Sequence, residues 1–219
     1  MDLIPWLPQA ASLALARHGL WALVLGGAAC WLLRGRSRPM QLSVLALALL
    51  CTALPGSLSV SYWLGLAFKA PSLVSAALGL VAVVLTLWPR LRQRLTPAEP
   101  GGSSPWPWLR GLAVTLGWLL LADMLALLPM SLYAWGFGTP ALALALLVLL
   151  LLGWRWGAVP AVQPGLLLAG AILLLFVLTR WPSGNLWDAL LDPLLWLGLQ
   201  MRWLHSLRTS ARARSVHTA

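Results

Sequence analysis

Long apolar segments dominate this chain and limit what it can fold into. Seven stretches are mostly apolar, at about 13–33, 40–56, 71–88, 109–128, 139–156, 163–179 and 186–204. A helix needs about 20 apolar residues to cross the hydrocarbon core of a bilayer. Backbone groups in lipid must be satisfied within the segment, and Leu and Ala favour helix. The sequence therefore predicts an all-α, polytopic membrane protein with about seven transmembrane helices.

The composition excludes the two main alternatives to a membrane protein. Hydrophobic residues make up 60% of the 219 residues and charged residues 9%, whereas soluble domains are about 45–50% apolar and about 25% charged. A water-soluble globule of this size would lack the polar residues to cover its surface. An intrinsically disordered chain would be poor in apolar residues.

The basic residues predict the orientation of the spans. If seven spans alternate, 12 of the 15 Lys and Arg residues fall on one side, and only Arg17, Lys69 and Arg180 fall on the other. Cytoplasmic loops carry such an excess, so we expect the N-terminus outside and the C-terminus in the cytoplasm of a bacterial-type inner membrane. The net charge of +10 then needs no nucleic acid as partner, since no basic stretch carries a nucleic-acid-binding motif.

A segment rich in Pro, Gly and Ser divides the chain. Residues 89–108 have the composition of a flexible linker, here cytoplasmic. They separate an N-terminal three-helix part, residues 1–88, from a C-terminal four-helix part, residues 109–204, and both parts are expected to pack into one bundle. Residues 205–219 form a basic cytoplasmic tail, of which we expect the last dozen residues to be disordered.

Two outer connections share an order of residues. Leu-Pro-x-Ser-Leu followed by Tyr, Trp, Gly, Phe and Pro occurs in 54–71 and again in 128–140. Duplication of a helical hairpin would produce this order, but Pro, Trp, Tyr and Gly are also common where chains leave a membrane. In the first connection, residues 57–70 have the pattern of a short helix, which lies either in the membrane interface or partly re-entrant.

Asp123 is the first candidate for a functional residue, because it lies inside the apolar segment 109–128. An ionised Asp in the membrane costs about 2.5–3.5 kcal/mol, so it should face the bundle interior and have a partner. The candidate partners at similar depth are Arg17, His18, Lys69 and Arg180. Two roles remain open: a proton- or ion-linked carboxylate, or a structural bond that holds two helices together.

The other candidates lie near the outer ends of the spans. Arg17 can extend to the interface, and His18 has a side chain that can titrate at physiological pH, although a lone His is more often structural. Asn185 is a suitable N-cap for the seventh span, which places Asp188 where a carboxylate accepts bonds from free backbone N–H groups. Asp192 follows one turn later, where Pro193 predicts a kink.

Known catalytic patterns are mostly missing. The chain contains no His-x-x-x-His, Cys-x-x-Cys, Gly-x-Ser-x-Gly or Walker sequence, so we expect no metal, no cofactor and no catalytic residues. Two weaker enzymatic hypotheses remain. Lys69 with Ser57, Ser59 or Ser61 would be a Ser–Lys dyad. Asp123 with Asp188 or Asp192 would be a carboxylate pair.

Three functional classes follow from these observations. The first is a non-catalytic scaffold or assembly subunit that packs with other membrane proteins, as the small residues at 26–29 and the scarcity of polar residues in the spans suggest. The alternative is a small proton- or ion-linked transporter that uses Asp123. The third is an intramembrane enzyme. Because it ranks last, we expect a protein without enzymatic activity more than an enzyme. The lipid bilayer is the common partner of all three.

Overall fold

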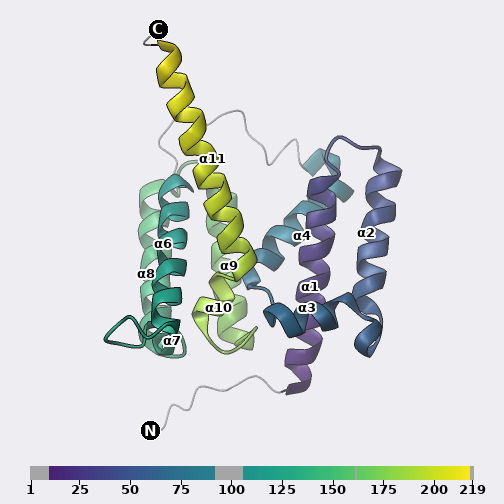
Figure 1. The fold of residues 1–219 in the computed structure, drawn as a ribbon, viewed down its shortest axis with the longest axis horizontal. Coiled ribbons are helices and arrows are strands. Elements are labelled where there is room, and N and C mark those ends of the chain that lie inside the picture. Colours follow the sequence, from purple (N-terminus) through teal and green to yellow (C-terminus); the bar gives the residue numbers. More distant parts are fainter. Residues whose placement is uncertain (1–9, 92–105, 161, 218–219) are drawn as a thin grey trace.

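The computed structural model describes residues 10–91, 106–160 and 162–217, and every regular element in these ranges is a helix (Figure 1). The longer helices are α1 (Ala10–Leu32), α2 (Arg38–Ala53), α4 (Leu73–Leu87), α6 (Trp106–Met124), α8 (Thr139–Trp156), α9 (Gln163–Thr179) and α11 (Pro193–His217). The short helices are η1 (Gly56–Leu58), α3 (Val60–Phe68), α7 (Leu132–Trp135) and α10 (Leu186–Leu190). The expected all-α class is confirmed for these ranges.

The short helices gather at one end of the molecule. Helices α3, α7 and α10 lie at the lower end in Figure 1, and α3 lies across α1 there. We call this the α3 end. The opposite end holds the turn with Arg34, Arg36 and Arg38 between α1 and α2, and also Arg155 at the last turn of α8. We call this the basic end.

One described helix is long and apolar enough to cross a membrane on its own composition. This helix is α8, and 6% of its apolar window is buried inside the molecule. A core helix of a soluble protein would be mostly buried, so α8 directs its apolar surface outward. Helices α2, α4 and α9 are apolar too, with 16, 15 and 17 residues. They are shorter than the roughly 20 residues that a bilayer requires of an untilted helix.

The seventh apolar segment is not one helix, contrary to the expectation of a kinked span. Helix α10 ends at Leu190 and α11 begins at Pro193. Proline lacks a backbone N–H and disfavours helical geometry in the preceding residue, so the chain breaks at Asp192. The expectation of a disordered tail is also wrong as far as His217, because α11 extends to that residue. Most of the linker expected at 89–108 lies outside the described residues.

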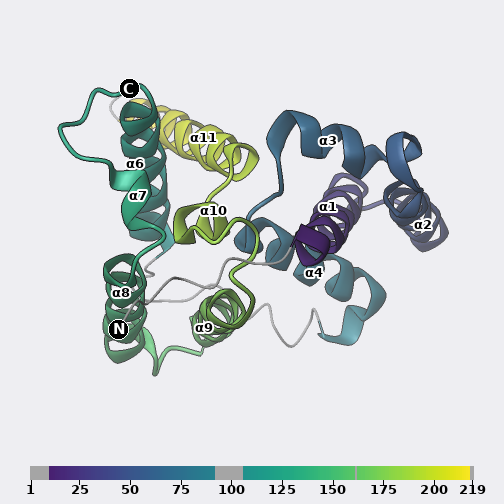
Figure 2. The ribbon, with the colours of Figure 1, turned by 90° about the horizontal axis from the view of Figure 1, so that it is seen from below.

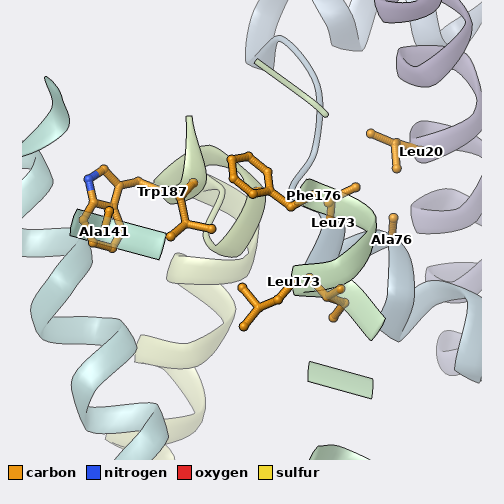
Figure 3. Packing of buried hydrophobic residues seen from close by; sticks show 10 residues of the cluster. Leu20, Leu73, Ala76, Ala141, Leu173, Phe176 and Trp187 are labelled. Carbon is orange, nitrogen blue, oxygen red and sulfur yellow. The ribbon is translucent and has the colours of Figure 1, made fainter. Parts of the chain in front are cut away.

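The core joins the N-terminal and C-terminal helices near the α3 end. Leu20 of α1 and Leu73 of α4 pack with Phe176 of α9 and Trp187 of α10 in one buried cluster (Figure 3). Figure 2 views the α3 end and places α10 near the middle of it. Helix α4 contacts α1 on one side and α9 and α10 on the other. Both parts of the chain therefore form a single packed body.

Helices α1 and α4 pack backbone against backbone. A Cβ atom added to Gly27 would lie 2.3 Å from the Cα of Gly79, and one added to Gly79 would lie 2.2 Å from the carbonyl oxygen of Leu23. Only glycine fits at such a crossing. We expected the small residues at 26–29 to allow close helix packing. Among them, Gly27 packs against Gly79 of the same chain.

Candidate functional site

Three groups of hydrogen-bonded polar side chains lie at the α3 end, and they include most of the functional candidates proposed from the sequence. The first group surrounds Asp192, which is 7% exposed. Its Oδ2 accepts hydrogen bonds from the backbone N–H of Ser72 at 2.9 Å, from the Ser72 hydroxyl at 2.7 Å and from the Ser75 hydroxyl. Its Oδ1 accepts from the N–H of Leu195 at 2.9 Å.

Asp192 therefore caps two helices at once. Ser72 is the N-cap of α4, and Leu195 lies in the first turn of α11. The positive ends of two helix dipoles and four donors meet one carboxylate, so both of its buried oxygens have hydrogen-bond partners. This arrangement fixes the start of α11 against the start of α4, and so joins the two parts of the chain.

The second group is organised by Tyr133 of α7. The backbone N–H of Tyr133 donates to Oδ2 of Asp123 at 2.6 Å, and its hydroxyl donates to Oδ2 of Asp188 at 2.8 Å. Asp188 also accepts from the hydroxyl of Ser183. The amide of Asn185 donates to the Tyr133 carbonyl at 2.9 Å, and its oxygen accepts from the N–H of Trp187. Asn185 is thus the N-cap expected from the sequence, although it caps the short helix α10.

Burial raises the pKa of Tyr133 above its ordinary value of 10.0, and its hydrogen bond to Asp188 raises it further. The neutral phenol can donate to the carboxylate, whereas a phenolate would repel it. Tyr133 is therefore a fixed donor at neutral pH, and it holds Asp188 in place.

The role expected for Asp123 changes with this geometry. Asp123 is the penultimate residue of α6 and lies at the α3 end, so it is not deep within the helix. Among the described residues its carboxylate bonds to the Tyr133 N–H, and none of the four expected cationic partners forms an ion pair with it. The weaker hypothesis paired Asp123 with Asp188 or Asp192, whereas the structure links Asp123 to Asp188 indirectly, through Tyr133.

The third group joins α1, α2 and α3. The Nδ1 atom of His18 is hydrogen-bonded to the hydroxyl of Ser61, and it lies 3.2 Å from the carbonyl oxygen of Thr52. The hydroxyls of Ser59 and Ser61 are 2.6 Å apart, and Ser59 also donates to the Thr52 carbonyl at 2.9 Å. We call His18, Thr52, Ser59 and Ser61 the His18–Ser61 cluster. Both serines are fully buried.

Arg17 lies beside this cluster. Its side chain covers the face of α3 at Gly65, where an added Cβ would lie 2.7 Å from Cδ of Arg17. The Nε atom of Arg17 is buried and has no hydrogen-bond partner within the described residues. Gly65 is one helical turn after Ser61, so Arg17, His18 and Ser61 meet along one side of α3.

Lys69 and Arg180 take structural positions. Lys69 ends α3 with a φ of 60°, its side chain is exposed, and its carbonyl accepts from the indole N–H of Trp21 at 3.0 Å. Arg180 ends α9 in the left-handed region, and its guanidinium lies 5.3 Å from the ring centre of Phe176. No hydrogen bond joins the Lys69 side chain to Ser57, Ser59 or Ser61 in the described part of the chain, and the hydroxyls of Ser59 and Ser61 bond to the Thr52 carbonyl and to His18.

Sequence reasoning missed the donors that organise these groups. Tyr133, Ser72 and Ser75 were not candidates, and Ser61 was considered only with Lys69. The Ser-x-x-Ser spacing of 72–75 is a usable signal, because Ser72 accepts a bond from the N–H of Ser75 as an N-cap does. The bond of Tyr133 to Asp188 spans 55 residues and has no signal in the local sequence.

The described residues contain no group of three or more His, Cys, Asp or Glu side chains placed to hold a metal ion. Comparisons of the chain with protein-family models, with curated proteins and with solved structures find no match. The function must therefore be argued from the geometry alone.

Proposed function

We propose that this chain is a multi-pass inner-membrane protein with a non-catalytic role, as a scaffold or assembly subunit that packs with other membrane proteins. The observation that carries the proposal is the use of its carboxylates. Asp123, Asp188 and Asp192 all accept hydrogen bonds from backbone N–H groups or from hydroxyls at helix ends. They are used to hold the helices together, which favours a structural role over ion coupling or catalysis.

The exposed apolar surface supports the membrane part of this proposal. Large apolar side chains are exposed in the middle of the helices, including Leu150 of α8 at 70% and Leu174 of α9 at 61%. Soluble monomers rarely expose contiguous apolar surface on this scale. Tryptophans at helix ends are exposed as well, as Trp31 and Trp154 show at 58% and 87%, and indoles favour the membrane–water interface.

The polarity of the two ends supports the proposed seven-span topology. The described carboxylates lie at the α3 end, and the turn with Arg34, Arg36 and Arg38 lies at the basic end. This distribution agrees with an outer α3 end and a cytoplasmic basic end. Helices of 15 to 17 residues would then be completed by the apolar residues at their ends or by local thinning of the bilayer.

Site-specific photo-crosslinking tests the assembly role. A benzophenone amino acid replaces Leu150 on the exposed face of α8, or Ala141, which is 3% exposed on the same helix. The proposal expects a discrete crosslinked protein from position 150 in membranes and none from position 141. Crosslinks to lipid alone from exposed positions on α8, α9 and α2 would contradict an assembly role.

Transport through Asp123 is the competing proposal, and Asp123→Asn separates the two. The asparagine retains an oxygen that can accept the Tyr133 N–H bond. A scaffold should therefore keep its membrane abundance and its crosslinked partner. A carrier should keep its abundance and lose a pH-dependent flux in reconstituted vesicles.

The His18–Ser61 hydrogen bond favours an intramembrane hydrolase as a second candidate. A His nitrogen bonded to a Ser hydroxyl can take the hydroxyl proton when the oxygen attacks an acyl carbon. Against this role, Ser61 is fully buried and is part of a bonded cluster that also includes the Thr52 carbonyl. A fluorophosphonate probe that labelled Ser61 in the intact protein, and not in His18→Gln, would establish the hydrolase and overturn the scaffold.

A further inference from the structure

A cavity opens at the basic end between α1, α2 and α4, away from the polar groups described above. Its volume is about 190 Å³, and Arg34, Arg36 and Arg38 line it together with Gln41, Thr86 and Cys30. Drug-sized ligands need about 300–1,000 Å³. The size therefore suits a small polar group held by three guanidinium side chains.

The walls of the cavity are held in place by hydrogen bonds. Gln41 donates to the carbonyl oxygens of Leu33 at 3.0 Å and Arg36 at 3.2 Å, which fixes the turn between α1 and α2. Arg38 donates to the carbonyl of Leu87 at 3.1 Å, which fastens the turn to the end of α4. Gly35 allows the turn itself with a φ of 87°. The arginines thus project from an ordered scaffold.

In the described part of the chain, no carboxylate neutralises the positive charge at this cavity. The carboxylates of Asp123, Asp188 and Asp192 are all engaged at the α3 end. Helix α2 also begins here, and its N-cap Ser37 makes no side-chain capping bond. The positive end of the α2 dipole therefore adds to the field of the three arginines.

We propose that this cavity binds a phosphate group, and that its source is the headgroup of an anionic phospholipid. Guanidinium groups bind phosphate through paired hydrogen bonds. Basic pockets between helices on the cytoplasmic side suit lipid headgroups. The lipid as source rests on the proposed membrane insertion, whereas phosphate binding by the cavity does not.

The surroundings of the cavity match a lipid at headgroup depth. Trp31 and Trp88 are 58% and 59% exposed at the adjoining ends of α1 and α4, where indoles mark the membrane interface. Ala82 and Leu85 supply an apolar wall on the side of the cavity formed by α4. If the phosphate of a lipid lay among the arginines, its glycerol and acyl chains would lie along this wall and the exposed helix faces.

The test is thermal unfolding of the full-length protein in a neutral detergent with added lipid or phosphate. A ligand that binds the folded state raises the unfolding midpoint with its concentration, which yields an apparent affinity. The additions are dioleoylphosphatidylglycerol, dioleoylphosphatidylcholine as the neutral-headgroup control, and inorganic phosphate. We expect phosphatidylglycerol to stabilise the protein and phosphatidylcholine to have a much smaller effect.

Three variants identify the site. The double variant Arg34→Gln/Arg36→Gln should weaken the apparent affinity for phosphatidylglycerol by at least about tenfold, since each arginine near an anionic surface contributes about fivefold. Ala82→Leu keeps every charge and fills the cavity, so it should weaken binding as well. Arg110→Gln/Arg202→Gln removes the same charge from a separate cavity at the basic end and should leave the affinity unchanged.

The outcomes distinguish whether the cavity binds phosphate at all from whether a lipid headgroup supplies that phosphate. Stabilisation by phosphatidylglycerol and by inorganic phosphate, lost in both cavity variants, supports a phosphate site with the lipid as one source. Stabilisation by phosphatidylglycerol alone supports the lipid as ligand. Equal effects of phosphatidylcholine, equal losses in the Arg110/Arg202 variant, or full affinity in Ala82→Leu would overturn the proposal. Stabilisation by inorganic phosphate alone would keep the site and reject the lipid.

Discussion

At the scale of single residues, Asp192 has the largest structural role among the described carboxylates. It joins two helix N-termini that are 120 residues apart in sequence and accepts four hydrogen bonds. A buried carboxylate costs free energy unless its bonds are complete, and here they are. The helix break at Asp192 is therefore part of the architecture, because an uninterrupted helix would not direct this side chain to α4.

Asp192→Ala should destabilise the protein more than Asp123→Ala. The first change leaves the donors of Ser72, Ser75 and Leu195 without their acceptor, and we expect a loss of about 3 kcal/mol or more. The second removes one bond from the Tyr133 N–H and should cost about 1 kcal/mol. Reversible unfolding in mixed micelles measures both. Equal losses would show that Asp192 does not join the two parts of the chain.

Tyr133→Phe should remove a contribution to the free energy of unfolding that is present at neutral pH and is lost at alkaline pH. The bond to Asp188 is made to a charged acceptor and should contribute about 1.5–3 kcal/mol. Because the pKa of Tyr133 is raised above 10.0 in the folded state, this contribution is complete below pH 10 and decreases as the pH rises further. The difference in the free energy of unfolding between wild type and variant should be constant from pH 7 to 9 and should decrease above pH 10.

Tyr62→Phe is the matched control for that experiment, since Tyr62 is the other tyrosine of the chain. Its hydroxyl does not bond to Asp188, so the alkaline change should not appear. A difference for Tyr133→Phe that grew above pH 10 would contradict the bonding described here.

At the scale of helices, the crossing of α1 and α4 determines how tightly the N-terminal part packs. Gly27→Ala forces a methyl group to within 2.3 Å of the Cα of Gly79, so the helices must separate. We expect a destabilisation of about 1–3 kcal/mol. Gly19→Ala on the same helix meets no atom within 4 Å and should stabilise it by up to about 1 kcal/mol. Unfolding midpoints of the two variants that moved in the same direction would argue against this crossing.

The helices themselves were largely predictable from the sequence. The segments expected at 139–156 and 163–179 agree with α8 and α9, because apolar runs of this length have one favourable state in lipid. The expected short helix at 57–70 is present as η1 and α3. Ser59 is the N-cap of α3 and Ser131 is the N-cap of α7, but the shared order of residues aligns Ser131 with Ser57, so the two N-caps do not occupy matching positions.

The partners of the polar residues were not predictable. His18 and Ser61 are 43 residues apart, and Ser72 and Asp192 are 120 apart. Such pairs depend on how helices are arranged around each other, and a single sequence carries no local pattern for that. The four candidate partners named for Asp123 did not include the group that bonds to it, because a backbone N–H at the start of α7 meets the carboxylate where α6 ends.

At the scale of the whole molecule, the two ends differ in chemistry. The α3 end contains hydroxyls, amides and carboxylates in closed hydrogen-bond groups, and the basic end contains arginines around a cavity. In a membrane, the first arrangement suits the outer surface and the second suits the cytoplasmic surface with its anionic lipids. The proposed lipid site and the proposed orientation both follow from this difference.

The central claim is that the bilayer separates these two ends, and cysteine labelling in intact bacterial cells tests it most directly. Single cysteines replace Ser57 and Ser131 at the α3 end, or Arg36 and Ala158 at the basic end, in a Cys30→Ala/Cys51→Ala background. The account predicts that a membrane-impermeant maleimide labels positions 57 and 131 in intact cells, and labels positions 36 and 158 only after the membrane is permeabilised. Labelling of position 36 or 158 in intact cells would contradict it.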